Sequence, residues 1–316
     1  MKKAECLRSR VSSHFSVLNL ALHCLVALSI CVSTSVYVRA QEAVEVIKVD
    51  VSLVTVNVAV KDSKGRPLTG LRSQDFLITD DDAPVSPEYF ESEGPASIVF
   101  VVDTSSSMNG AKWKSLKHGL KGFLQKSRLD NDYTLIAFHS SAHIVAESVS
   151  GPELCKSLSE LKPSGETALY DAVILGLDVL KRTRQRNRAL VLITDGEDNS
   201  SRAKLREVER DAFSRRAMIY SVGVLLNDYC SRGIKEACNG KETVDQLAAI
   251  TGGVAFFPDD SELTNTLKAI SNEVNNQYSL SYYPPTKNAG WRTVRVAVSQ
   301  TERRPKLRYQ HRYWMN

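Results

Sequence analysis

The sequence lacks the residue patterns of several large enzyme classes. It contains no nucleophile paired with a histidine, no zinc-type set of His and Cys ligands, and no glycine-rich phosphate loop. No internal repeat or low-complexity tract is present either. These absences disfavour catalysis by an activated nucleophile, zinc catalysis and nucleotide binding.

A charge excess of one sign is also missing once the first forty residues are set aside. The chain of 316 residues has 41 Lys and Arg against 36 Asp and Glu. Residues 1–40 hold five of the basic and one of the acidic residues, which leaves 36 against 35. The composition therefore gives no argument for a nucleic-acid partner. Hydrophobic residues at 42% and charged residues at 24% fit a folded globular protein.

The first forty residues have the features of a secretory signal peptide. Lys2 and Lys3 precede a largely apolar stretch at about 15–38, and the small-residue pattern Val38-Arg39-Ala40 precedes Gln41. We predict a signal peptide at 1–40 and a secreted, periplasmic or cell-envelope location. An uncleaved leader is the alternative, and it is the only membrane attachment that the sequence suggests.

Cysteine is scarce in the remainder of the chain. Three of the six cysteines lie in the leader, which leaves Cys155, Cys230 and Cys238. Cys230 and Cys238 are close together in a polar segment, so a local disulfide is expected in an oxidising compartment, with two free thiols as the alternative.

Two patterns of secondary structure divide the chain after the leader. Residues 44–61 alternate apolar and β-branched with polar side chains, which predicts a long half-buried strand. Between 96 and 275 apolar strands alternate with amphipathic helices, which predicts a doubly wound α/β domain with a mainly parallel six-stranded sheet. Strand patterns return after 276. The flanks 41–95 and 276–316 are each too small for an independent core, so we predict that they pair into one β-sandwich around the inserted domain.

The expected elements have the following bounds. In the central domain we expect strands at Ser97–Asp103, Tyr133–Phe138, Ala142–Glu147, Ala189–Thr194, Met218–Val224 and Val254–Phe257. We expect helices at Ala111–Lys126, Pro152–Leu161, Ala168–Thr183, Ala203–Arg215, Thr243–Ile250 and Ser261–Asn275. In the flanks we expect further strands at Phe76–Thr79, Val85–Phe90, Tyr278–Tyr282, Thr293–Val298 and Lys306–Tyr313. We expect a solvated turn at Asp80–Asp82, with a cation site as the alternative for these three acids.

An oxygen-rich turn follows the apolar strand that ends at Asp103. Asp103, Ser105 and Ser107 have the spacing Asp-x-Ser-x-Ser, which can direct three oxygens at one point. The polar segments Gly165–Asp171 and Thr194–Asp198 adjoin other predicted elements. Ligands of open α/β sheets bind at the carboxyl ends of strands, and hard divalent cations prefer oxygen donors.

These three segments resemble the metal-ion-dependent adhesion site of von Willebrand factor type A domains. The flanks, with Gly65–Leu71 and Gln277–Pro284, are similar to the bacterial secreted family of VWFA-related domain proteins. The resemblance implies a divalent cation, Mg²⁺ first and Mn²⁺ or Ca²⁺ as alternatives. The implied metal ligands are the carboxylates of Asp103 and Asp195 and the hydroxyls of Ser105, Ser107 and Thr167.

Three further acids lie beside these residues. Glu166, Glu197 and Asp198 either tune the charge of the site or are solvated loop residues. Taken one by one, Asp103 and Thr167 are also suited to helix caps, and Asp195 to a turn.

The resemblance implies a binding module of the adhesion type and not an enzyme. Its cation would bind a protein partner that carries an accessible Asp or Glu carboxylate. A metal-stabilised structural component of an envelope assembly is one alternative. A metal-assisted hydrolase, in which Glu166 or Glu197 acts with the cation on water, is the other.

Overall fold

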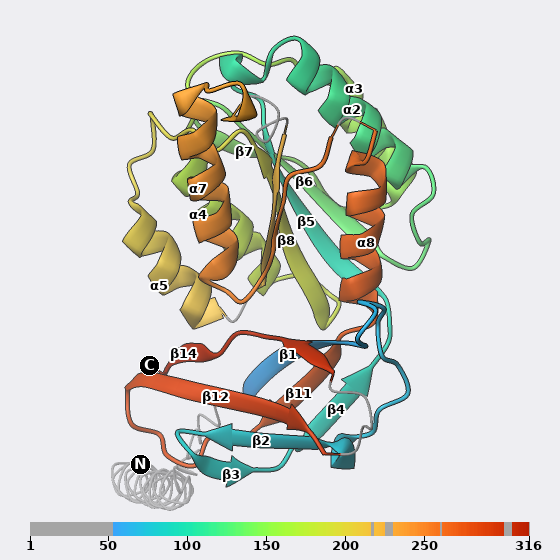
Figure 1. Cartoon of the computed structure of the whole chain (residues 1–316), viewed down its shortest axis with the longest axis vertical. Coiled ribbons are helices and arrows are strands. Elements are labelled where there is room, and N and C mark those ends of the chain that lie inside the picture. Colours follow the sequence, from blue (N-terminus) through green and yellow to red (C-terminus); the bar gives the residue numbers. More distant parts are fainter. Residues whose placement is uncertain (1–52, 216–217, 225–229, 260, 300–304, 316) are drawn as a thin grey trace, which may run out of the picture. The chain divides into compact units, whose positions relative to one another are not determined.

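The computed structural model describes residues 53–215, 218–224, 230–259, 261–299 and 305–315. The predicted signal peptide and residues 44–52 of the first expected strand lie outside this range. Residues 51–316 form one compact unit. Its described part contains a six-stranded sheet and two four-stranded sheets (Figure 1).

The six-stranded sheet has the order β10-β9-β8-β5-β6-β7. Neighbouring strands are parallel, except that β7 is antiparallel to β6. The strands are β5 (Ala96–Asp103), β6 (Asp132–Phe138), β7 (Ala142–Val149), β8 (Asn187–Thr194), β9 (Ile219–Gly223) and β10 (Ala255–Phe256). This arrangement confirms the predicted fold class.

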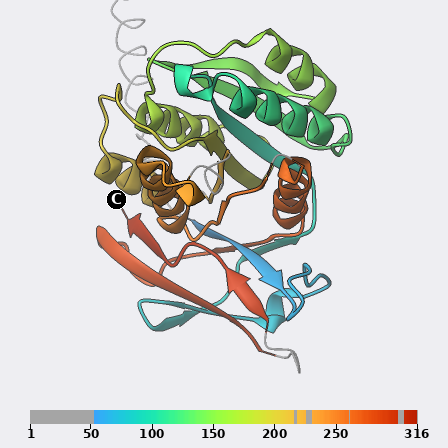
Figure 2. The ribbon, with the colours of Figure 1, turned by 45° about the horizontal axis from the view of Figure 1, so that its top comes forward.

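Helices cover both faces of this sheet (Figures 1 and 2). They are α2 (Ala111–Leu124), α3 (Gly151–Glu160), α4 (Leu169–Lys181), α5 (Leu205–Arg215), α7 (Lys235–Ala249) and α8 (Leu263–Asn275). Alternate residues of the fully buried β5 point to opposite faces. Phe100 therefore joins a core with α2, α3 and α8, whereas Val101 joins a second core with α4, α5 and α7.

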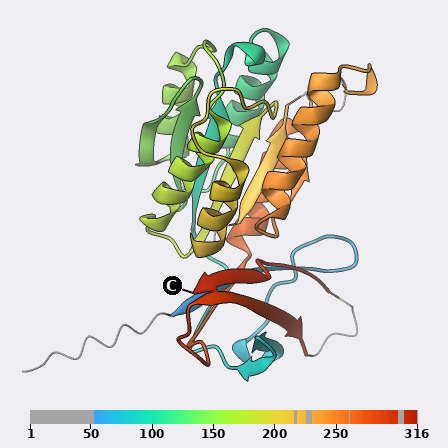
Figure 3. The ribbon, with the colours of Figure 1, turned by 90° about the vertical axis from the view of Figure 1, so that its left-hand side faces the viewer.

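The two four-stranded sheets combine strands from both ends of the chain (Figure 3). Their orders are β13-β1-β11-β4 and β14-β12-β2-β3. The strands are β1 (Val54–Lys61), β2 (Phe76–Asp80), β3 (Ala83–Val85), β4 (Tyr89–Ser92), β11 (Tyr278–Tyr282), β12 (Gly290–Val298), β13 (Lys306–Arg308) and β14 (Arg312–Met315). Inward residues of both sheets share one apolar core, in which the rings of Phe76 and Tyr278 lie 5.1 Å apart.

Three expected elements were wrong in extent. The pattern at Val85–Phe90 is two strands in different sheets, because the Ser86-Pro87 pair interrupts the backbone pairing. The pattern at Lys306–Tyr313 is likewise divided between β13 and β14. Helix α7 begins at Lys235 and not at Thr243, since its first turns bury the small residues Ala237 and Gly240, which carry little hydrophobic signal.

The prediction of a solvated turn at Asp80–Asp82 was wrong for Asp80. This residue lies on the inward face of β2 with Phe76 and Ile78, and it is fully buried. Its Oδ1 accepts a hydrogen bond from Nε of Arg292 at 2.8 Å, and its Oδ2 accepts one from the hydroxyl of Tyr313 at 2.8 Å. Strand β2 thus carries a paired charge into the sandwich core, and the turn itself begins at Asp81.

Replacing Tyr313 by Phe tests this buried contact. We expect the free energy of unfolding to fall by about 1.5–3 kcal/mol, because a donor to a buried carboxylate is lost. The matched control is Tyr89→Phe, since Tyr89 is 49% exposed. That control should change stability by less than about 0.5 kcal/mol in the same urea titration. Equal effects of the two changes would contradict the assignment.

No helix among the described residues is long and apolar enough to cross a membrane.

Candidate metal centre

Two loops of the candidate site follow neighbouring strands of the six-stranded sheet. Strands β5 and β8 lie side by side and end at Asp103 and Thr194. Strands β6 and β7 extend the sheet beyond β5, whereas β9 and β10 extend it beyond β8. The order therefore reverses between β5 and β8. A reversal of this kind opens a crevice at the carboxyl ends of the strands.

The loop after β5 holds Asp103, Ser105 and Ser107 together. Asp103 and Ser105 are buried, and Ser107 is half-buried. Oδ1 of Asp103 accepts a hydrogen bond from the backbone N–H of Ser105 at 2.8 Å. The hydroxyl oxygens of Ser105 and Ser107 lie 2.9 Å apart. This turn brings the two hydroxyls to one point, as the alternate spacing predicts.

The loop that contains Thr167 contacts both of the other loops. The N–H of Ser106 donates to the carbonyl of Gly165 at 3.0 Å. On the other side, the N–H of Thr167 donates to Oδ1 of Asn199 at 2.8 Å. Thr167 is 1% exposed. It is therefore enclosed where the three polar segments meet.

Asp195 follows β8 and is 2% exposed. Its Oδ2 lies 2.6 Å from Nζ of Lys112, near the start of α2. Its Oδ1 is buried and has no hydrogen-bond partner in the described part of the chain. An unpartnered carboxylate oxygen is costly to bury, and a cation or a hydrogen-bond donor at this atom would offset that cost.

The electrostatics of the site also favour a cation. Burial, followed by the nearby carboxylate of Asp195, raises the pKa of Asp103 from 3.8 to about 6. A divalent cation between two such carboxylates relieves their repulsion. Carboxylate and hydroxyl oxygens are donors of the type that Mg²⁺ takes. The residues present therefore fit a divalent cation.

The described residues contain no group of three or more His, Cys, Asp and Glu arranged to hold a metal. The candidate centre has two carboxylates and three hydroxyls, so it differs in composition from such a group, which needs at least three His, Cys, Asp or Glu side chains.

The raised pKa predicts how stability depends on pH without a cation. Folded Asp103 has a pKa near 6 against an ordinary value of 3.8, so between these values the folded state binds more protons than the unfolded state. With EDTA present, the free energy of unfolding should fall as pH rises from about 4 to about 6. Excess Mg²⁺ should reverse the trend, because the cation competes with the proton. Urea titrations across this pH range measure both effects. If the free energy of unfolding of an Asp103→Asn variant falls with pH as that of the wild type does, Asp103 is not the group responsible.

Glu166 and Glu197 differ in their surroundings. Glu166 is exposed, whereas Glu197 is half-buried. Burial and the carboxylate of Asp195 raise the pKa of Glu197, Lys112 opposes the rise, and Glu236 adds to it. Glu197 and Glu236 also line a cleft of about 390 Å³ beside the Asp195 loop. Glu197 is thus electrostatically coupled to Asp195.

Asp198 has a structural contact. Its Oδ1 accepts hydrogen bonds from the backbone N–H groups of Leu169 and Tyr170 at 2.9 and 3.4 Å, at the start of α4. A carboxylate at the amino terminus of a helix satisfies its free donors and its dipole. Asp198 therefore caps α4 from a loop 29 residues away in sequence.

Two residues that the sequence reasoning did not select also hold the carboxylates. Lys112 pairs with Asp195, and the hydroxyl of Thr194 donates to Oδ2 of Asp103 at 2.6 Å. Thr194 directly precedes Asp195 at the end of an apolar strand, and this position could have indicated that its hydroxyl belongs to the site. Lys112 follows the Ser107 turn by five positions, but nothing in its own segment marks it as a partner of Asp195.

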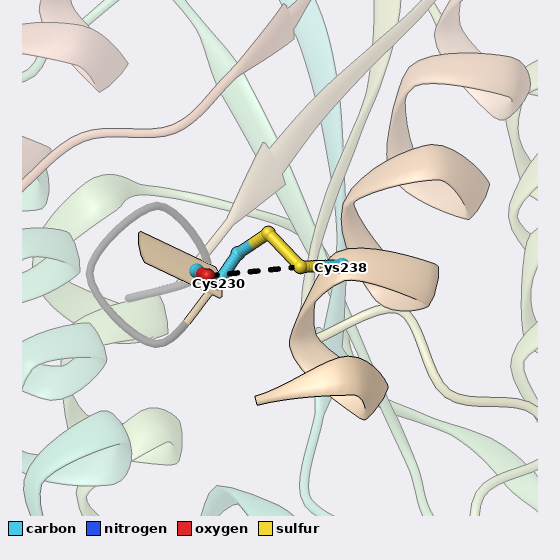
Figure 4. The surroundings of a disulfide bond; sticks show 2 residues. All are labelled: Cys230 and Cys238. Carbon is cyan, nitrogen blue, oxygen red and sulfur yellow. Dashed lines mark hydrogen bonds between the residues drawn. A yellow bond between two sulfur atoms is a disulfide. The ribbon is translucent and has the colours of Figure 1, made fainter. Parts of the chain in front are cut away.

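Cys230 and Cys238 are joined by a disulfide (Figure 4). Cys155 is a free cysteine and is half-buried.

These features define a doubly wound α/β domain whose candidate cation centre lies at the carboxyl ends of its parallel strands. Residues 98–197 match the family model described as the von Willebrand factor type A domain. Residues 98–197 therefore belong to a von Willebrand factor type A domain, which is the domain that the resemblance predicts. Members of this domain family are often adhesion or protein-interaction modules.

Curated relatives match part of the chain. It is 26% identical over 190 residues to "Uncharacterized protein sll0103" of Synechocystis sp., covering 58% of this chain and 42% of that protein. It is 26% identical over 180 residues to inter-alpha-trypsin inhibitor heavy chain H3 of Bos taurus, covering 47% of this chain and 20% of that protein. The chain thus matches less than half the length of each of these relatives.

Solved structures give partial matches to the chain. A von Willebrand factor type A protein from Catenulispora acidiphila has a TM-score of 0.47 and 12% identity, covering 84% of this chain and 75% of that chain. The vWF domain of the type V pili tip protein Mfa5 from Porphyromonas gingivalis has a TM-score of 0.46 and 13% identity, covering 58% and 96%.

Proposed function

We propose that this protein is an exported binding module that holds a divalent cation and uses it to bind a carboxylate of a protein ligand. The proposed cation ligands are Asp103, Ser105, Ser107, Thr167 and Asp195. Mg²⁺ is the first choice, with Mn²⁺ or Ca²⁺ as alternatives. The observation that supports the site most strongly is the buried, unpartnered Oδ1 of Asp195 beside a second buried carboxylate.

The surrounding residues set how the site would work. Thr194 and the N–H of Ser105 orient Asp103, and Lys112 neutralises part of the charge of Asp195. Three of the five donors are neutral hydroxyls, which donate little charge. A cation bound there would stay electrophilic and attract an anionic group from a partner.

Binding is favoured over catalysis by the family of the central domain, whose members are often protein-interaction modules. Export is supported by the predicted signal peptide at 1–40 and by the Cys230–Cys238 disulfide, since disulfides persist in oxidising compartments. These two features are independent of each other.

A retention assay tests the proposed function. The immobilised protein is exposed to an envelope extract of the cells that produce it, with Mg²⁺ or with EDTA. We expect a protein to be retained with Mg²⁺, released by EDTA, and lost when the carboxyl groups of the extract are methyl-esterified. Thr167→Ala should abolish retention, whereas Thr167→Ser, which keeps the hydroxyl, should preserve it. Retention that survives EDTA or esterification would contradict the proposal.

A further inference from the structure

The Cys230–Cys238 disulfide lies at the start of α7, the helix that backs the Asp195 loop. It joins residues eight apart in sequence, and their Cα atoms are 4.9 Å apart. Cys238 belongs to the first turns of α7, and Cys230 precedes the helix (Figure 4). The bond therefore ties the first turn of α7 to the segment that precedes the helix.

The first turns of α7 lie outside the two large cores of the central domain. Residues 231–236 are exposed. Ala237 and Val244 form a small apolar cluster against which Cys230, Ala255 and Phe257 pack, separate from the two large cores of the central domain. The second half of the helix is fixed differently, because Leu247 belongs to a large core. The disulfide is thus a covalent restraint on a part of α7 that otherwise rests on this small cluster and on its contact with the Asp195 loop.

That part of α7 touches the Asp195 loop directly, backbone against backbone. A Cβ atom added to Gly240 would clash with the carbonyl oxygen of Asp195, and one added to Gly196 would clash with the backbone of Gly240. Gly196 also has a φ of +85°, which favours glycine. The backbone of α7 at Gly240 therefore supports the residue whose Oδ1 is the unpartnered atom of the site: a shift toward the loop would press on Asp195, and a shift away would remove that support.

We infer that the Cys230–Cys238 disulfide is a redox-sensitive restraint on cation binding. The oxidised bond holds α7 against Asp195 in the binding geometry. Both cysteines are half-buried, so a small dithiol can reach the bond. A dithiol reduces it by transferring two electrons and two protons, which gives two cysteine thiols and the disulfide of the reagent. The first turns of α7 then loosen, and affinity for the cation falls. This inference rests on the proposed metal centre.

Calorimetric titration with Mg²⁺ alone tests the inference on the full chain. We expect oxidised protein and the control variant Cys155→Ser to bind with equal affinity. Protein reduced with dithiothreitol and desalted should bind about 10- to 100-fold more weakly, as is usual when the support of a metal ligand is lost. Reoxidation should restore the affinity. Equal affinity before and after reduction would overturn the inference.

A second variant tests the contact between α7 and Asp195 without reducing the disulfide, so that unfolding caused by reduction does not enter the result. Gly240→Ala keeps the disulfide and improves helix propensity, yet it places a methyl group against Asp195. It should weaken Mg²⁺ binding, whereas Glu242→Ala, an exposed change on the same helix, should not. Unchanged binding by Gly240→Ala would also overturn the inference. If oxidised wild-type protein binds no cation, the proposed function fails first, and that outcome is distinct from a loss of redox dependence.

Discussion

Asp103→Asn should abolish Mg²⁺ binding and at the same time stabilise the cation-free protein. The amide removes one of two carboxylates, and affinity should fall by at least about 100-fold, more than the loss of a supporting residue causes. Without a cation, the charged carboxylate of Asp103 is disfavoured by burial and by Asp195, as its pKa of about 6 indicates. The amide oxygen can still accept from the N–H of Ser105, and the amide NH2 can donate to the hydroxyl oxygen of Thr194 with the direction of that bond reversed, so stability at pH 7 should rise by on the order of 2 kcal/mol.

The two effects have opposite signs and are measured by calorimetry with Mg²⁺ and by urea titration in EDTA. Asp178→Asn is the matched control, because Asp178 is an exposed carboxylate on α4. It should change neither quantity appreciably. If Asp103→Asn binds Mg²⁺ as wild type does, or if it destabilises the cation-free protein, Asp103 does not have the role assigned to it.

Glu273→Ala should produce the largest loss of stability. Glu273 is 3% exposed near the end of α8. It forms ion pairs with Lys61 on β1 and with Arg308 on β13, the latter at 2.8 Å, and accepts a hydrogen bond from the hydroxyl of Tyr220 at 2.9 Å. One carboxylate thus joins α8 and the six-stranded sheet to both flanks of the chain.

Removing the carboxylate takes the acceptor away from two partly buried cations and from the buried hydroxyl of Tyr220, which keeps the hydrogen bond that it accepts from Gln277. We expect the free energy of unfolding to fall by about 3–5 kcal/mol. Glu160→Ala, an exposed change at the end of α3, should alter it by less than about 0.5 kcal/mol. Thermal and urea unfolding measure the difference. A loss below about 1 kcal/mol would place Glu273 among surface ion pairs and contradict this assignment.

The central domain could be predicted closely because its strands are buried on both faces. A continuous apolar run such as the one in β8 indicates a strand, and it also indicates that the strand belongs to a parallel sheet covered on both faces. In the flanks, the period-two pattern identified strands but not their sheet membership. Tyr89 and Val85 follow one alternating pattern yet belong to β4 and β3, which lie in different sheets. Sheet membership depends on distant partners, which local alternation does not encode.

The candidate ligands could be named from the sequence because each lies at an element boundary in a family motif. Their supporting contacts could not, since these join residues far apart along the chain. Lys112 reaches Asp195 across 83 positions, and Glu273 reaches Lys61 across more than 200. The sequence suggests that Asp198 tunes the charge of the site, but it does not show that Asp198 caps α4, because that contact forms only when the two loops fold together. The domain boundaries at 40, 95 and 275 and the leader itself remain predictions.

Titrating purified, oxidised protein with Mg²⁺, Mn²⁺ and Ca²⁺ in separate calorimetric experiments examines the basis of the proposed function. A single saturable site for at least one of these cations, absent in the Asp103→Asn protein, is the predicted result. Heats no greater than dilution for all three, with a protein whose circular dichroism shows it folded, would contradict the account.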